Sequence, residues 1–211
     1  MIERIDHKKP GMILFLAFCF LSSYGQADSV ALADISSHRK KQEDTFRNPQ
    51  ETPLAPKDRK KFKGLNYYPP DLNYRVKARF VRSETPVFFK MKTTTSRLPD
   101  YVKYGEVHFT LKGQPYKLEV YQSPDIIQRP GYEDYLFIPF TDLTNGHSTY
   151  DVGRYLEFRI PDSEDVIIDF NKAYNPYCSY SPNYSCPIPP AANSLNVEIH
   201  AGEKVYKDKR H

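Results

Sequence analysis

Short runs of strand-forming residues, separated by turn residues, fill the chain from Tyr74 onward and limit the folds open to it. The runs are rich in Val, Ile, Phe, Tyr and Thr, and Gly, Pro, Asn and Asp lie between them. In the run YRVKARFVR, apolar Val76, Ala78 and Phe80 alternate with charged residues, so one face is expected to be buried. No helix-length apolar pattern separates the runs, which argues against parallel β-α-β units. We therefore predict a mainly β domain with an antiparallel sheet.

About eight strands are expected, near residues 74–82, 87–93, 105–111, 116–121, 135–140, 155–160, 166–170 and 195–199. Turn signals lie between them: Lys112-Gly113-Gln114 has hairpin spacing, Thr144-Asn145-Gly146 contains an Asn-Gly turn, and Pro161-Asp162-Ser163 closes another pair. The strands are expected to close into an antiparallel β-sandwich or a partly open barrel.

The first 27 residues have the three parts of a secretory signal peptide. Lys8 and Lys9 precede the apolar run MILFLAFCFL, which SSYGQA follows. The apolar run has ten residues, whereas a transmembrane helix needs about 20. We expect cleavage after Gln26 or Ala27 and an exported protein, either periplasmic or extracellular.

Behind the signal peptide (1–27), the sequence divides into three further segments. A short helix beginning at Asp28 or Ser29 is expected to stop at Asn48-Pro49, and Pro49, Pro53 and Pro56 predict an extended arm. The predicted segments are an N-terminal helix with a proline-rich arm (28–63), a single β domain (64–205) and a basic tail (206–211).

Charge and missing motifs exclude several classes of function. The formal net charge of +4 is too small to predict nucleic-acid binding. Basic clusters at 39–41, 57–63 and 204–210 indicate solvated helix ends and a solvated tail, or at most weak peripheral contact with an anionic membrane surface. The sequence has no phosphate-binding glycine loop, G-x-S-x-G, H-E-x-x-H or dinucleotide fingerprint, so no cofactor is expected.

Two cysteines, Cys178 and Cys186, remain after loss of the leader, in the segment AYNPYCSYSPNYSCPIPP (173–190). An even number of cysteines in an oxidising compartment predicts a disulfide, and Pro182 and Asn183 allow the chain to turn back between them. Two alternatives stay open. A zinc site is disfavoured because its cysteines are usually two to four residues apart, so no metal is predicted. A nucleophilic cysteine would need a neighbouring histidine, which the sequence does not place.

Polar residues follow the apolar strand Val166–Ile168 where it runs into the cysteine-containing segment, and sites are commonly built at such places. The candidate cluster is Asp169, Asn171, Tyr174 and Asn175, with Arg154 and Tyr155 expected to face it. A structural role, as a loop-holding ion pair and an Asn-Pro turn, is the alternative. The 17 tyrosines and absence of tryptophan suggest stacking surfaces for sugars or peptides, or half-buried strand residues.

Several motifs in the last third of the chain match a known pattern: Gly153-Arg154-Tyr155-Leu156, Ala173-Tyr174-Asn175-Pro176, Cys186-Pro187 and Ala201-Gly202-Glu203-Lys204. On these motifs the chain from about Arg47 onward resembles the bacterial and archaeal domain-of-unknown-function family 1684. The resemblance implies a single domain of no established activity. Ala192 departs from the pattern, because the family commonly has a glutamate just before the residue corresponding to Asn193.

Two hypotheses for the function follow. The first is a binding or structural module of the periplasm or envelope that recognises a small molecule, a glycan or an envelope protein. The alternative is a hydrolase-type enzyme that uses Asp169 with Arg154, Asn171 or Asn175. The sequence leaves open whether the chain is an enzyme.

Overall fold

The computed structural model of the chain describes residues 13–206, so the start of the predicted signal peptide and most of the basic tail lie outside the described residues. Six strands form one antiparallel sheet. They are β1 (Arg75–Lys90), β2 (Asp100–Leu111), β3 (Gln114–Gln122), β4 (Tyr135–Phe140), β5 (Arg154–Arg159) and β6 (Asp165–Asp169). The mainly β, antiparallel prediction is confirmed.

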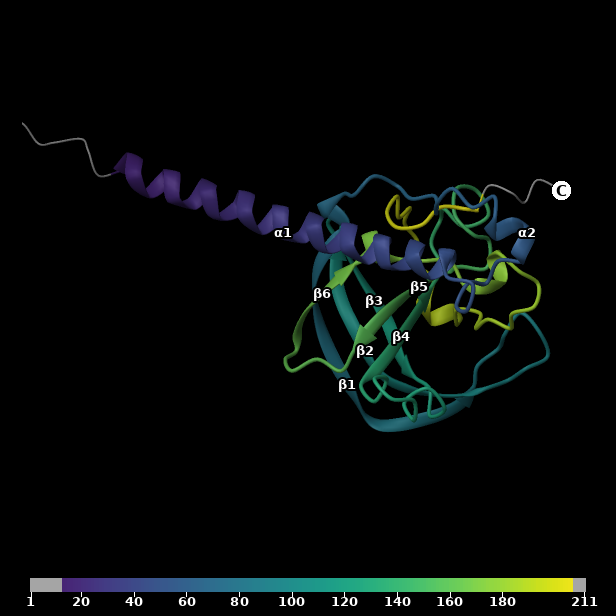
Figure 1. Cartoon of the computed structure of the whole chain (residues 1–211). Coiled ribbons are helices and arrows are strands. Elements are labelled where there is room, and N and C mark those ends of the chain that lie inside the picture. The colour runs from purple at the N-terminus through teal and green to yellow at the C-terminus, as the bar shows by residue number, and fades with distance from the viewer. Residues whose placement is uncertain (1–12, 207–211) are drawn as a thin grey trace, which may run out of the picture.

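The sheet curls into a half-barrel (Figure 1). Its strand order is β5-β4-β3-β2-β1-β6, so β5 and β6 are the two edges although they are consecutive in the sequence. Only residues 160–164 connect them, and an extended chain spans at most about 3.5 Å per residue. The sheet must therefore bend until its edges approach each other, which gives an open barrel.

The predicted count of eight strands is wrong. The runs near 74–82 and 87–93 form one strand, β1, because both halves pair with β2, and a register shift between Arg82 and Val87 absorbs the residues between them. The run 195–199 is not a strand: Leu195 N donates to Thr141 O at 2.8 Å and Ser194 makes a single bridge, too few contacts for a ladder.

The other five strands lie close to their predicted positions. The hairpin between β2 and β3 turns at Lys112 and Gly113, whose φ angles of 50° and 76° are the two positive values that a type I′ turn requires.

Helix α1 (Ile13–Arg47) is longer than the expected helix. Its end before Asn48-Pro49 is confirmed, but it does not begin at Asp28 or Ser29. The C-terminal half of α1 lies against the half-barrel, whereas the N-terminal half projects beyond it (Figure 1). A second helix, α2 (Pro56–Arg59), interrupts the proline-rich arm. Within residues 13–206, no helix is both long and apolar enough to cross a membrane.

Two apolar clusters lie on opposite faces of the sheet. All six residues of β4 are buried. Leu136, Ile138 and Phe140 pack in the larger cluster, the main core, whereas Tyr135 and Phe137 belong to a second cluster that contains both cysteines. Because successive side chains in a strand point to opposite faces, a strand buried throughout needs a layer on each side. The second layer is the segment 173–190.

Candidate functional site

Backbone hydrogen bonds attach the cysteine-containing segment 173–190 to strand β5 near its start and to the connection between β1 and β2 near its end. Tyr155 N donates to Tyr174 O at 2.9 Å, and Tyr174 N returns a bond to Tyr155 O at 3.0 Å. At the other end, Thr94 N donates to Cys186 O at 2.9 Å. The many prolines between and beyond these points lack an N–H and therefore fit a segment that pairs only at isolated positions.

A cavity of about 460 Å³ lies between this segment, the sheet and the loop that follows β3. Its size falls in the range of small-molecule sites. We call it the tyrosine cavity, because six tyrosines line it together with Phe137, Ile126 and Cys186; the six are Tyr101, Tyr135, Tyr155, Tyr174, Tyr177 and Tyr184.

The alternation of side chains along β4 and β5 explains why these tyrosines face the cavity. Tyr135 and Phe137 are two residues apart on β4, and Tyr155 and Glu157 are two residues apart on β5, so each pair faces the same side of the sheet. Tyr101 comes from the start of β2. The cavity therefore draws on three strands, β2, β4 and β5.

Burial disfavours the ionised form of several tyrosines in the cavity. It raises the pKa of Tyr101 to about 12 and raises those of Tyr155 and Tyr174 well above the ordinary value. Tyr155 Oη donates to Pro187 O, and the hydroxyls of Tyr135 and Tyr174 are hydrogen-bonded to each other. Tyr101 Oη makes no hydrogen bond within the described part of the chain, so it is available to a ligand.

The two cysteines lie together beside the tyrosine cavity, but the structure shows no disulfide at bonding distance between them. Cys178 N donates to Cys186 Sγ at 3.2 Å, and Tyr150 Oη lies 3.6 Å from Cys178 Sγ. The hydrogen bond from the Cys186 thiol lowers the pKa of Cys178. The two cysteines are therefore neighbours, and the covalent bond between them stays a prediction.

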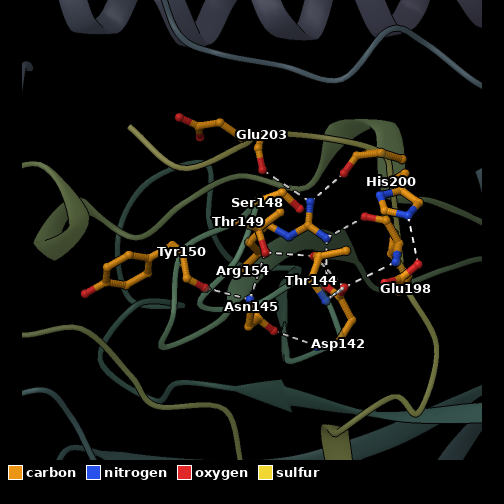
Figure 2. A network of polar contacts seen from close by, with 12 residues as sticks. Asp142, Thr144, Asn145, Ser148, Thr149, Tyr150, Arg154, Glu198, His200 and Glu203 are labelled. Carbon is orange, nitrogen blue, oxygen red and sulfur yellow. Dashed lines mark hydrogen bonds and ion pairs between the residues drawn. The ribbon is translucent and has the colours of Figure 1, made fainter. Parts of the chain in front are cut away.

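Arg154 does not face the predicted cluster. It is fully buried, and its Nη2 pairs with Asp142 Oδ2 at 2.7 Å (Figure 2). Nη2 also donates to Ile199 O at 3.0 Å, and Nη1 donates to Ala201 O at 2.5 Å. This arginine therefore fastens the C-terminal segment to the turn after β4. Arg154 therefore has the structural role, a loop-holding ion pair, that was the alternative in the sequence analysis.

Asp169 and Asn171 likewise hold the backbone. Asp169 Oδ1 accepts from Asn171 N at 3.0 Å and from its Nδ2 at 2.9 Å, and Asp169 Oδ2 is 3.5 Å from Arg75 Nε. Asn171 also exchanges two hydrogen bonds with the backbone of Asp71, at 2.8 and 2.9 Å. Asp169 and Arg75 line a separate cleft of about 170 Å³ between β5, β6 and α1.

Asn175 is buried and joins the segment 173–190 to the C-terminal segment. Its N donates to Glu203 Oε2 at 2.9 Å, and its Nδ2 donates to Lys204 O at 2.8 Å. Tyr180 Oη also donates to Glu203. Of the six candidate residues, only Tyr155 and Tyr174 therefore line the tyrosine cavity.

Sequence reasoning missed Tyr101, Tyr135 and Glu157, which line the cavity with them. The alternation within β4 and β5 was the available signal, but it does not say which strands become neighbours. Among the described residues, no group of three His, Cys, Asp or Glu side chains is placed to hold a metal ion.

Fold and site together define a class of protein: an antiparallel half-barrel with a proline-rich segment over its outer face and a tyrosine-lined cavity beneath that segment. The chain belongs to the family described as protein of unknown function (DUF1684), whose profile matches residues 60–204.

A solved structure supports the same assignment. The chain is similar to an uncharacterised protein of Haloarcula marismortui, determined by solution NMR, with 32% identity and a TM-score of 0.68. The match covers 88% of this chain and 99% of the Haloarcula chain. No protein with a curated description matches the sequence.

Proposed function

We propose that this protein is an exported binding module that holds a small molecule or glycan in the tyrosine cavity. The observation that carries the proposal is the cavity itself: about 460 Å³, lined by six tyrosines. Aromatic rings offer a large contact area at little cost in conformational entropy, and their hydroxyls supply hydrogen bonds. Apolar walls with a few polar groups are the usual composition of ligand sites.

Export is supported by the way α1 packs. Residues 26–30 are exposed, and the first buried side chain described on the helix is Ala31. Cleavage after Gln26 or Ala27 would therefore remove none of the described buried contacts.

In an oxidising compartment, we propose that Cys178 and Cys186 form a disulfide. The hydrogen bond of 3.2 Å from Cys178 N to Cys186 Sγ already holds the two residues close, and Cys186 lines the cavity. Closing so short a loop contributes on the order of 2.5 kcal/mol through the entropy of the unfolded chain. The bond would fix the wall of the cavity that the segment 173–190 provides.

Geometry favours binding over the hydrolase hypothesis. A hydrolase built on Asp169 and Arg154 needs both at one cavity, but Arg154 is committed to Asp142 and Asp169 holds Asn171. Asn171 and Asn175 are engaged by backbone groups of Asp71 and Lys204. None of these four residues lines the tyrosine cavity.

Filling the cavity tests the proposal. The chain 28–211 is screened by ligand-observed NMR and thermal shift against mono- and oligosaccharides and small polar metabolites. Ile126 lines the cavity, whereas its neighbour Ile127 does not. We expect Ile126→Trp to abolish binding of every compound found and Ile127→Trp to retain it, with both variants folded by circular dichroism. Equal binding by both variants would place the ligand elsewhere.

A further inference from the structure

The aromatic rings that line the tyrosine cavity lie in nearly perpendicular pairs. Phe137 and Tyr155 have ring centroids 4.7 Å apart at an interplanar angle of 75°, and Tyr155 and Tyr174 are 5.8 Å apart at 87°. Tyr177 and Tyr184 form a third pair, at 5.2 Å and 75°. The face of an aromatic ring is the negative side of its quadrupole, and rings set in several orientations are how proteins surround ammonium groups.

The same cavity contains a carboxylate. Glu157 follows Tyr155 by two positions on β5, so it shares the face of the strand that carries the tyrosine, and it lines the cavity. Its negative charge, after burial, also raises the pKa of Tyr135, Tyr174 and Tyr177. The field of the carboxylate therefore reaches the tyrosines of three different segments.

No described cation forms an ion pair with Glu157. Burial raises the pKa of Glu157, and the charges of Lys41 of α1 and Arg159 of β5 act in the opposite direction. Arg159 is occupied, because its Nη1 pairs with Asp134 Oδ1 at 2.6 Å. Lys41 is exposed and lies beyond ion-pair distance.

Three other charged residues line the cavity: Arg97, Asp125 and Arg129. Arg97 Nη2 donates to Ser185 O at 2.8 Å, so this guanidinium is held by the segment 173–190. Asp125 and Arg129 also line the cavity, and within the described residues neither forms an ion pair. The lining therefore holds two guanidinium groups and two carboxylates, and Glu157 is the carboxylate on the sheet face that carries the tyrosines.

From this combination we infer that the ligand of the tyrosine cavity is an organic ammonium compound, held between the tyrosine rings and the carboxylate of Glu157. The inference rests on the proposed binding function and names the class of its ligand. Ring faces attract a cation through their quadrupole, and the carboxylate adds an opposite charge. Neutral sugars donate hydrogen bonds to a carboxylate but gain neither an ion pair nor a cation–π attraction.

Choline and tetramethylammonium are suitable probes, and 3,3-dimethyl-1-butanol is the uncharged counterpart of choline with nearly the same shape. Each is titrated into the chain 28–211 by isothermal calorimetry at low and high salt. We expect both cations to bind and the alcohol to bind at least about tenfold more weakly, because only the cations gain the cation–π and carboxylate interactions.

Two variants locate the interaction. Glu157→Gln keeps the shape of the side chain and removes its charge, so the affinity for choline should fall about tenfold while that for the alcohol stays unchanged. Glu164→Gln is the matched control, since Glu164 is an exposed acid that does not line the cavity and pairs with Arg79 at 2.8 Å. This control should bind choline as the parent does.

The outcomes separate the two proposals. Equal affinity for choline and the alcohol, or an unchanged affinity in Glu157→Gln, would overturn the ammonium inference. Binding of neutral oligosaccharides without ammonium compounds would also overturn it, yet would leave the binding module standing. If neither class bound, both proposals would fail.

Discussion

Glu203, in the Ala201-Gly202-Glu203-Lys204 motif, is a buried carboxyl group whose pKa is raised in the folded chain. Burial raises its pKa from the ordinary 4.5 to about 8, although the Asn175 N–H and the charge of Arg154 act in the opposite direction. The folded chain therefore binds a proton on Glu203 more tightly than the unfolded chain does. That contribution to stability is fully present below pH 4.5 and is lost as the pH rises through about 8.

Glu203→Gln should therefore change how the free energy of unfolding depends on pH. Between pH 5 and 8 the free energy of unfolding should fall with pH more steeply in the parent than in Glu203→Gln, by up to about 1.4 kcal/mol per pH unit. Urea unfolding of both proteins at several pH values measures it. Parallel curves for the two proteins would show that Glu203 ionises normally in the folded chain.

Gly202 illustrates a position fixed by space as well as by backbone angle. Its φ is 75°, and a Cβ there would lie 2.6 Å from Ala173 O and 2.6 Å from Phe170 O. Gly113 has nearly the same φ, 76°, but a Cβ there meets nothing within 4 Å. The difference between the two alanine variants isolates the steric effect.

We expect Gly113→Ala to lower the free energy of unfolding by about 1 kcal/mol through backbone strain alone. Gly202→Ala should lower it by at least about 2 kcal/mol more, because two backbone oxygens must move. Guanidinium unfolding of the pair provides the measurement. Similar losses in both variants would mean that the chain around Ala173 yields easily.

At the scale of elements, the sequence located most strands but could not say how they combine. Alternation identified β2 to β6, whereas Ser83-Glu84-Thr85-Pro86 has the composition of a turn and is instead a bulge within β1. The run 195–199 has the alternating burial of a strand, with Leu195 and Ile199 buried. Its backbone pairs with other backbone groups only at the short segment 141–143, as in Leu143 N to Val197 O at 3.1 Å, so no ladder forms.

The candidate site was partly predictable for the same reason. Tyr155 and Tyr174 were found because they lie at a strand and in the cysteine-containing segment. Arg154 and Asp169 are as polar as site residues. Arg154 pairs with Asp142 through packing that the sequence does not display, whereas Asp169 forms a local turn with Asn171, two residues further on. Tyr101 and Glu157 join the cavity only because β2 and β5 belong to one curled sheet.

The C-terminal half of α1 should be an integral part of the domain, because Ile35 is fully buried and Arg39 Nη1 donates to Tyr68 O at 2.9 Å. Ile35→Ala is expected to lower the free energy of unfolding by about 2 to 4 kcal/mol, whereas Leu32→Ala, at a position 41% exposed, should change it by less than about 0.5 kcal/mol. Chemical denaturation of both variants measures this. Equal, small effects would indicate that α1 is only loosely attached.

For the molecule as a whole, the proposed export and the proposed disulfide are linked, because disulfides persist in oxidising compartments. The predicted leader carries the third cysteine, Cys19. A chain secreted through its own leader should begin at Ala27 or Asp28 and should have lost Cys19. It should also lack two hydrogen atoms relative to the reduced mass, since Cys178 and Cys186 would be joined. Intact-mass spectrometry and thiol titration under denaturing conditions measure both properties.

The free energy of unfolding then shows whether a Cys178–Cys186 disulfide stabilises the fold. Under oxidising conditions, the double variant Cys178→Ser/Cys186→Ser should unfold with a free energy about 2.5 kcal/mol lower than the secreted parent, because the bridge restricts the unfolded chain. In a reducing buffer most of that difference should disappear. The serine pair is a matched control, because it keeps side chains of similar size at both positions. Two titratable thiols in the secreted, correctly cleaved chain would contradict the disulfide while leaving export intact, and an uncleaved chain retained in the cytoplasm would contradict both.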